Sequence, residues 1–109
     1  MRQRESTDFM PRVFLSQAAL DDLRRLDEFL VASDDPMAGE LLDFILDALQ
    51  VLAHQPAIGR PVDCGLRELI ISRRRSGYLA RYEFDGARDL VLVARIRHQR
   101  ESGYAEGDL

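Results

Sequence analysis

The chain has 109 residues, enough for one domain with a buried core, and its composition of 46% hydrophobic and 31% charged residues is typical of a soluble globular protein. No apolar run approaches the ~20 residues of a membrane span, and the single Cys64 excludes an internal disulfide and a cysteine-rich zinc site. Because the positively charged N-terminus lacks the apolar segment of a secretory signal, we expect a cytoplasmic protein with no membrane partner. We expect residues 1–109 to form a single domain with flexible ends at 1–10 and 105–109.

The formal net charge of -4 is unevenly distributed. The first 55 residues contain 11 acids and 5 arginines, whereas residues 56–109 contain 8 acids and 10 arginines, so the two parts carry -6 and +2. All 15 basic residues are arginine. Genomic base composition is one explanation; the other is that arginine suits planar, bidentate contact with a carboxylate or phosphate.

The chain begins with a predicted strand and a predicted helix. The segment "RVFLS" at 12–16 has the pattern of a short strand, and Ser16 is placed to cap the helix that follows. From residue 17 to about residue 31, apolar side chains recur at three- and four-residue steps: Leu20, Leu23, Leu26, Phe29 and Leu30. Charged residues, among them Arg25, occupy the other side. This spacing predicts an amphipathic helix.

A second helix is predicted after the break "ASDDP". Asp34 or Asp35 can cap it, and Pro36 is acceptable in a first turn because the missing N–H has no partner there. Apolar residues at helical spacing carry it to about His54. A break this short makes the two helices antiparallel neighbours.

The apolar period then changes from 3.6 to 2, which predicts three strands at 66–72, 77–84 and 89–98. Asp85-Gly86 marks a hairpin turn between the last two. The expected fold is therefore α+β: an antiparallel sheet with an N-terminal helical hairpin packed on one face, in the order β-α-α-β-β-β. The sequence leaves open which side of the strand at 66–72 faces the core.

Alternation along the last two strands separates a core face from an open face. In the strand at 77–84 the expected core residues are the aromatic and small ones: Tyr78, Ala80, Tyr82 and Phe84. The opposite face mixes apolar side chains with arginines: Leu79, Arg81, Val91, Val93, Arg95 and Arg97. Such a surface is unusual in water, so it predicts a groove for a partner that is both apolar and negative. Alternatively, a second copy of the chain could bury this face in a homodimer.

The residues "GLRELIISRRRSGYLARYEF" at 65–84 and "LVLVARIRHQRESGY" at 90–104 resemble the RelE/ParE superfamily. These are the toxin components of bacterial type II toxin–antitoxin systems, also called plasmid stabilisation proteins. The segments "SQAALDDLRRL" and "HQPAIGRP" fit the same pattern, so the resemblance covers most of the chain. The family's fold has the element order predicted above.

The resemblance implies two mechanisms. Toxins of the RelE branch cleave mRNA in the ribosomal A site without a metal or other cofactor; they use basic side chains on the sheet, an Arg or His, and a Tyr near the C-terminus. In this sequence His98 and Tyr104 match this pattern, and Arg81 is a candidate two positions beyond the expected basic residue of the strand. However, Leu79 stands where a basic residue is expected, directly after Gly77-Tyr78. Toxins of the ParE branch instead poison DNA gyrase.

Three functions follow from the resemblance. The first is a ParE-like toxin that arrests growth by binding gyrase, which the incomplete nuclease pattern and the acidic net charge favour. The alternatives are a RelE-like ribosome-dependent endoribonuclease and a non-toxic module that binds an antitoxin. A cognate antitoxin is the expected partner in each case, and no cofactor is expected. The residues expected to bind a partner or phosphate are Arg95, Arg97, Arg100, Leu79, Val91 and Val93.

Overall fold

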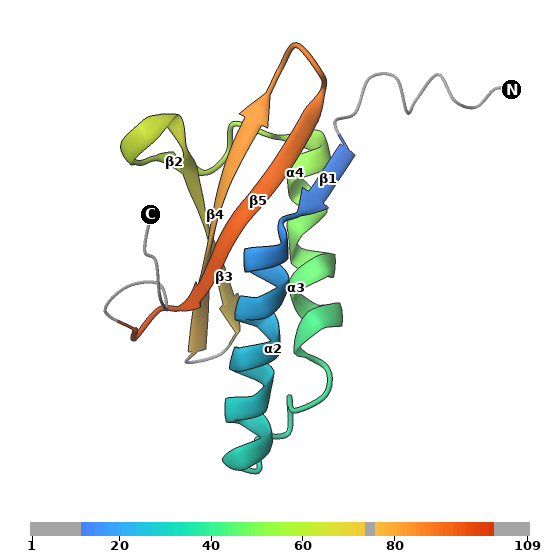
Figure 1. Cartoon of the computed structure of the whole chain (residues 1–109), viewed down its shortest axis with the longest axis vertical. Helices are drawn as coiled ribbons and strands as arrows, with labels where there is room; N and C mark the ends of the chain where they lie inside the picture. Colours follow the sequence, from blue (N-terminus) through green and yellow to red (C-terminus); the bar gives the residue numbers. More distant parts are fainter. Residues whose placement is uncertain (1–11, 74–75, 102–109) are drawn as a thin grey trace, which may run out of the picture.

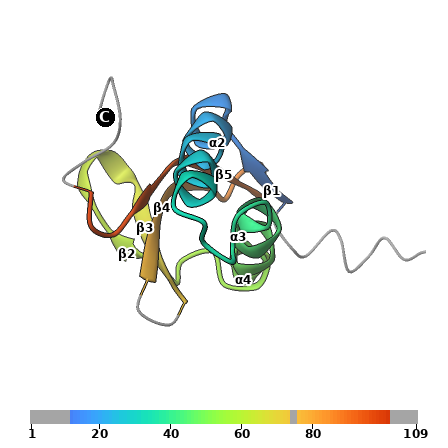
Figure 2. The ribbon, with the colours of Figure 1, turned by 90° about the horizontal axis from the view of Figure 1, so that it is seen from below.

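The computed structural model describes residues 12–73 and 76–101. Its elements, in chain order, are β1 (Arg12–Leu15), α2 (Gln17–Ala32), α3 (Leu41–Leu49), α4 (Val51–His54), β2 (Arg60–Pro61), the 3₁₀ turn η1 (Asp63–Gly65), β3 (Arg67–Arg73), β4 (Ser76–Asp85) and β5 (Leu90–His98). The strands form one sheet in the order β1-β5-β4-β3-β2. Helices α2 and α3 lie side by side against it (Figure 1), and the view along the molecule shows both on the same face (Figure 2).

The predicted α+β fold and its element order are confirmed, with two differences in the sheet. The sheet is mixed, because β1 runs parallel to β5, while the other neighbouring strands are antiparallel. It also gains the two-residue strand β2. A strand of two or four residues has too short a pattern to show its neighbour or its direction, so neither feature was visible in the sequence. No helix in the described part of the chain is long and apolar enough to span a bilayer.

The second helix begins later than the sequence predicts, at Leu41. The expected capping residue Asp35 instead closes a turn, because its Oδ1 accepts a hydrogen bond from the Met37 N–H at 2.8 Å. Gly39, at φ 86°, donates its N–H to Asp27 of α2 at 2.8 Å. The left-handed backbone at Gly39 ends this turn and delays the helix.

The cap of the first helix is confirmed. The Ser16 Oγ accepts a hydrogen bond from the Ala19 N–H at 3.0 Å and donates one to the carbonyl oxygen of Ala94 at 2.8 Å. The same hydroxyl therefore begins α2 and joins it to β5. Of the predicted apolar stripe, Leu23, Leu26 and Leu30 are buried in the core, whereas Leu20 and Phe29 are exposed.

A β-bulge in the β4–β5 ladder changes which residues of β5 face the core. Arg95 pairs with Arg81 and Val93 pairs with Tyr82, so Ala94 is the extra residue. Up to this point the odd-numbered residues of β5 face the helices, and after it the even-numbered ones do.

The prediction that Val91 and Val93 share an open face with the arginines is therefore wrong. Both valines are fully buried in the core, as is Ile96 beyond the bulge. Unbroken alternation placed them on the opposite face because a single inserted residue inverts every assignment on one side of it. By the same alternation Leu92 belongs on the core face, but it is instead exposed.

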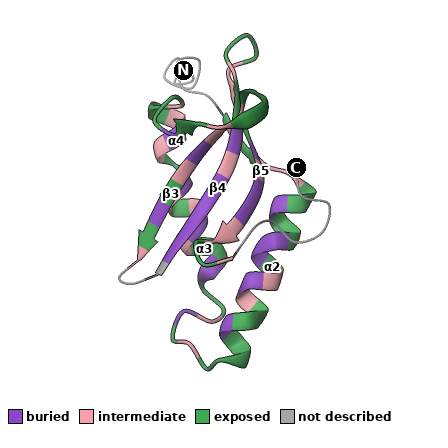
Figure 3. Ribbon diagram, turned by 90° about the vertical axis from the view of Figure 1, so that its left-hand side faces the viewer, coloured by how far each residue is buried: buried purple, intermediate pink, exposed green. Residues whose placement is uncertain are grey.

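The core face of β4 agrees with the alternation except at Phe84, which was expected in the core and is 38% exposed near the end of the strand. Tyr78, Ala80 and Tyr82 of β4 are buried in the core, and β4 is buried along most of its length (Figure 3). In β3, whose facing the sequence left open, Leu69 and Ile71 point to the core. Their neighbours on β3 face the other way.

The hydroxyl of Tyr82 holds the loop between α4 and β2. It donates to the Pro56 carbonyl oxygen at 2.7 Å and accepts from the Gly59 N–H at 2.9 Å. Burial, partly offset by the Gly59 hydrogen bond, raises the pKa of this phenol, which therefore stays neutral and able to donate. A Cβ on Gly59 would lie 2.7 Å from the Tyr82 hydroxyl and 2.9 Å from the backbone oxygen of Glu68.

We therefore expect Gly59→Ala to lower the free energy of unfolding by about 1–3 kcal/mol, because the added methyl meets backbone that cannot move aside. Urea denaturation measures this change. The control is Gly86→Ala, where a Cβ would make only ordinary contacts of 3.6 Å. Equal stabilities for the two variants would contradict the close packing of this loop against Tyr82.

Candidate functional site

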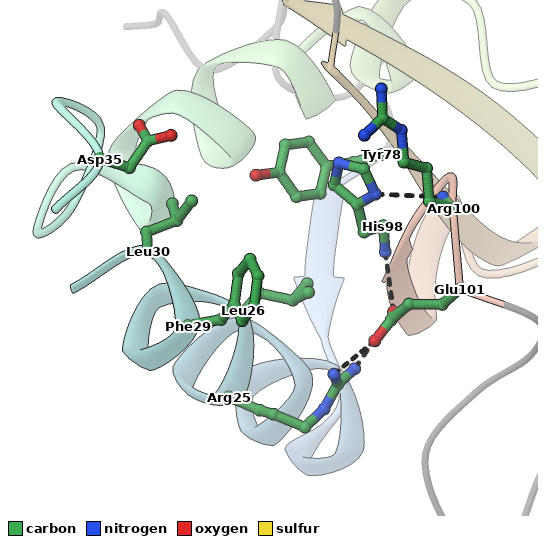
Figure 4. A pocket seen from close by; sticks show the side chains of 9 residues that line it. All are labelled: Arg25, Leu26, Phe29, Leu30, Asp35, Tyr78, His98, Arg100 and Glu101. Carbon is green, nitrogen blue, oxygen red and sulfur yellow. Dashed lines mark hydrogen bonds and ion pairs between the residues drawn. The ribbon is translucent and has the colours of Figure 1, made fainter. Parts of the chain in front are cut away.

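A cleft of about 470 Å³ lies between the second half of α2 and the end of the sheet where β4 begins and β5 ends (Figure 4). Its walls combine apolar and charged side chains: Arg25, Leu26, Phe29, Leu30, Asp35, Tyr78, His98, Arg100 and Glu101. Pockets of this size, apolar with a few polar groups, are the usual form of a binding site.

The helical wall of the cleft comes from one face of α2. Arg25 and Phe29 are one turn apart, as are Leu26 and Leu30, so all four lie along the same side. Leu26 and Leu30 are buried, whereas the ring of Phe29 is 70% exposed. The wall therefore has an apolar base and an exposed aromatic rim.

The sheet wall is formed by Tyr78 and His98, which pair across β4 and β5. Their rings meet edge to face, with centroids 5.2 Å apart and planes at 86°. Burial, then the nearby Asp35 carboxylate, raises the pKa of Tyr78, so its phenol is neutral.

The segment after β5 is fastened to this wall. The His98 Nδ1 accepts the Arg100 N–H at 3.0 Å, so a neutral His98 carries its proton on Nε2. The His98 N–H donates to Glu101 at 2.9 Å, and the Arg25 guanidinium binds the same carboxylate at 2.6 Å. Burial acts to raise the pKa of Glu101, but the bonds from Arg25 and His98 outweigh it, and the pKa is lowered.

A second ion pair lies deeper, between α2 and β5. The Asp22 carboxylate binds the Arg95 guanidinium through two hydrogen bonds, at 2.9 and 3.0 Å, and also accepts the Ile96 N–H at 2.9 Å. Only 4% of the Asp22 side chain and 8% of the Arg95 side chain are exposed. Arg95 is therefore a structural cation and does not lie on an open face, contrary to the prediction.

The sheet face away from the helices carries its own charges. Glu68, which is buried, binds Arg60 at 2.8 Å and lies 3.7 Å from Arg81. Leu79 and Arg97 pair with each other on this face, as alternation predicts, but Leu79 is buried. Within the described ranges no three His, Cys, Asp or Glu side chains gather to hold a metal ion.

Residues 13–103 match the family model of the ParE toxin of type II toxin–antitoxin system, parDE. The chain belongs to this family. It is a toxin of a type II toxin–antitoxin system, in the RelE/ParE superfamily. Among curated relatives, toxin RelE3 of Caulobacter vibrioides is 34% identical, over 84% of this chain and 98% of the relative. Toxin RelE1 of the same organism is 36% identical, over 82% of this chain and 94% of the relative.

Two solved structures share the toxin's fold. One belongs to the chromosomal ParDE system from P. aeruginosa, with a TM-score of 0.67 and 21% identity over 83% of this chain and 97% of that one. The other belongs to the toxin–antitoxin complex RelBE2 from Mycobacterium tuberculosis, with a TM-score of 0.51 and 21% identity over 83% and 99%.

The structure places His98 and Arg81, two of the candidate catalytic residues, on opposite faces of the sheet. Since Tyr78 faces the helices, its partner His98 does too, whereas Arg81, an odd number of positions along β4, faces the other side. His98 and Arg100 do meet, at the cleft. Tyr104 lies outside the described residues, as do the predicted flexible ends at 1–10 and 105–109.

Sequence reasoning missed the helical half of the cleft. Arg25 and Phe29 were assigned to the solvent and core sides of an amphipathic helix, and Glu101 was not considered. The one usable signal was the four-residue spacing of Arg25 and Phe29, which places a cation and an aromatic ring side by side. Nothing in the sequence pairs Glu101 with Arg25, 76 positions away.

We expect Arg95→Met to lower the free energy of unfolding by about 3–5 kcal/mol, because it leaves the Asp22 carboxylate buried without its counterion. The control is Arg24→Met, which removes an exposed ion pair to Asp21 worth about 0.5 kcal/mol or less. Urea denaturation of both variants provides the comparison. The structural role assigned to Arg95 is wrong if its replacement costs no more than that of Arg24.

The Glu101 clamp should depend on pH. Since the folded pKa is lowered, its contribution is complete above the ordinary value of 4.5 and is lost as the pH falls through the folded pKa. Glu101→Gln should therefore reduce stability by about 1 kcal/mol at pH 7 and by much less in acid. The exposed Glu83→Gln is the control. A difference from wild type that stays constant down to pH 2 would contradict the clamp.

Proposed function

We propose that this toxin arrests bacterial growth in the cytoplasm by binding and poisoning DNA gyrase, without chemistry of its own. The proposal extends the ParE branch of the family to this chain. Three features support it: the separation of His98 from Arg81, the engagement of the sheet arginines in ion pairs, and the acidic net charge.

The separation of His98 from Arg81 carries the most weight. Metal-free cleavage of a phosphodiester needs a base, an acid and a cation that converge on one phosphate. Here the candidate acid or base and the candidate cation face opposite sides of the sheet. The position where a basic residue would complete the site is the buried Leu79. This arrangement favours a toxin that binds over one that cleaves.

The arginines of the sheet also suit a protein target better than RNA. Arg81 lies beside Glu68, and Arg95 is bound by Asp22, so each already has a carboxylate close by. A cation held by an internal carboxylate contributes little to counterion release from a nucleic acid. The net charge of -4 opposes approach to the dense phosphate of a ribosome in the same way.

A cognate antitoxin is the second partner in this proposal. The two structural neighbours come from a ParDE system and a RelBE2 complex, and the family is defined by such pairs. The toxin leaves Phe14 of β1 and Leu92 of β5 exposed side by side, with the Arg12 guanidinium 5.6 Å from the Phe14 ring. An antitoxin segment with apolar and acidic side chains would cover this surface.

One observation favours the RelE-like ribonuclease as a second candidate. The cleft places His98 next to Glu101, Arg25 and Arg100, which is an acid or base beside cations. Its weakness as a nuclease site is that Glu101 is already bound by Arg25 and by the His98 backbone.

Pulse labelling of new DNA and new protein, minutes after induction of the toxin alone, distinguishes the candidates. We expect DNA synthesis to fall first, and His98→Ala to arrest growth as strongly as wild type. Protein synthesis that falls first, together with loss of arrest in His98→Ala, would establish the ribonuclease instead. A chain that binds its antitoxin but arrests nothing would be the non-toxic module.

A further inference from the structure

We propose that the cleft between α2 and the ends of β4 and β5 captures the toxin's protein target, by accepting an apolar side chain that lies beside a carboxylate. This inference rests on the proposed function and deepens it, since it names the surface and the chemistry of the target segment. Three features carry it: the exposed ring of Phe29, the guanidinium of Arg100, which has no partner among the described residues, and the acids that line the same walls.

Phe29 is the apolar anchor of this surface. At 70% exposure it is the most exposed large apolar side chain in the described part of the chain. It overhangs a cleft whose base is the buried Leu26 and Leu30, with the Tyr78–His98 pair opposite (Figure 4). An exposed aromatic ring beside a preformed apolar hollow has the character of an interface hot spot. An apolar side chain from a partner would remove both from water.

The charged residues around the cleft determine which group of the partner can lie next to its apolar side chain. Glu101 is bound by Arg25 and by the His98 N–H, and Asp35 accepts the Met37 N–H. Arg100 differs, because its guanidinium makes no hydrogen bond or ion pair to any residue that the structure describes. A planar guanidinium without such a partner can bind a carboxylate through two hydrogen bonds.

The same walls favour a protein over a nucleic acid. A phosphate backbone that approached Arg100 would also approach the carboxylates of Asp35 and Glu101. These two acids repel a chain of phosphates, whereas a single carboxylate beside an apolar side chain can contact Arg100 alone. The partner segment is therefore a large apolar residue next to an aspartate or glutamate.

The test measures binding of purified DNA gyrase to immobilised toxin and to four single variants. Phe29→Ser should weaken binding by about 30-fold or more, as truncation of a hot-spot aromatic does, and Arg100→Glu by about tenfold or more. Two controls lie outside the cleft: Leu42→Ser, 44% exposed before substitution, and Arg88→Glu, whose side chain is 78% exposed. These should bind within twofold of wild type. Thermal unfolding and antitoxin binding confirm that each variant is folded.

The outcomes separate the cleft from the proposed function. If Phe29→Ser and Arg100→Glu bind gyrase as well as the controls do, the cleft is not the target site. The same conclusion follows if these two variants lose only antitoxin binding and keep gyrase binding. If the wild-type toxin does not bind gyrase, the proposed function is wrong. The role of the cleft is then tested by the growth arrest that each variant causes. In that case, loss of arrest in both variants but in neither control supports capture of another protein target. Loss of growth arrest in Arg100→Glu alone indicates a phosphate ligand and contradicts the inference. Growth arrest that is retained in both Phe29→Ser and Arg100→Glu also contradicts it.

Discussion

The carboxylate of Asp22 meets three requirements of this fold at once. In the described part of the chain no strand pairs with this edge of β5 beyond the end of β1, and Asp22 accepts the Ile96 N–H there. It also neutralises the buried guanidinium of Arg95 and joins α2 to the sheet. A buried carboxylate is stable only when such partners surround it. The position of α2 over β5, and with it the helical wall of the cleft, depends on this contact.

The bulge at Ala94 lies directly before the two residues that Asp22 binds, Arg95 and Ile96. It adds one residue to β5, so that Val91 and Val93 face the core before it and Ile96 faces the core after it. Periodicity predicted the helices, the three long strands and the fold class because those features depend on local patterning. Periodicity could not locate the bulge, because both faces of β5 contain apolar side chains. An inserted residue therefore leaves no visible break in the alternating pattern.

The candidate site was less predictable than the fold, since its residues come from distant parts of the chain. His98 and Arg100 were identified by their resemblance to a family pattern, but the face that His98 occupies depends on the phase after the bulge. Phe29 belongs to a helical stripe that looks like core in the sequence. It is exposed only because the end of α2 extends past the sheet (Figure 3). Tertiary geometry, not local pattern, creates this cleft.

The arginines of an acidic chain are explained by these contacts. Asp22 holds Arg95 with a bidentate pair, and Glu68 lies between two arginines on the other face. The planar guanidinium satisfies several acceptors in a confined space, which an ammonium group does less well. Within the strand end, Arg95 is therefore an internal counterion that fixes α2 to the last strand. Arg100 at the cleft has no such internal partner among the described residues, and beside the apolar walls of that cleft it favours a target segment with an apolar side chain and a single negative charge.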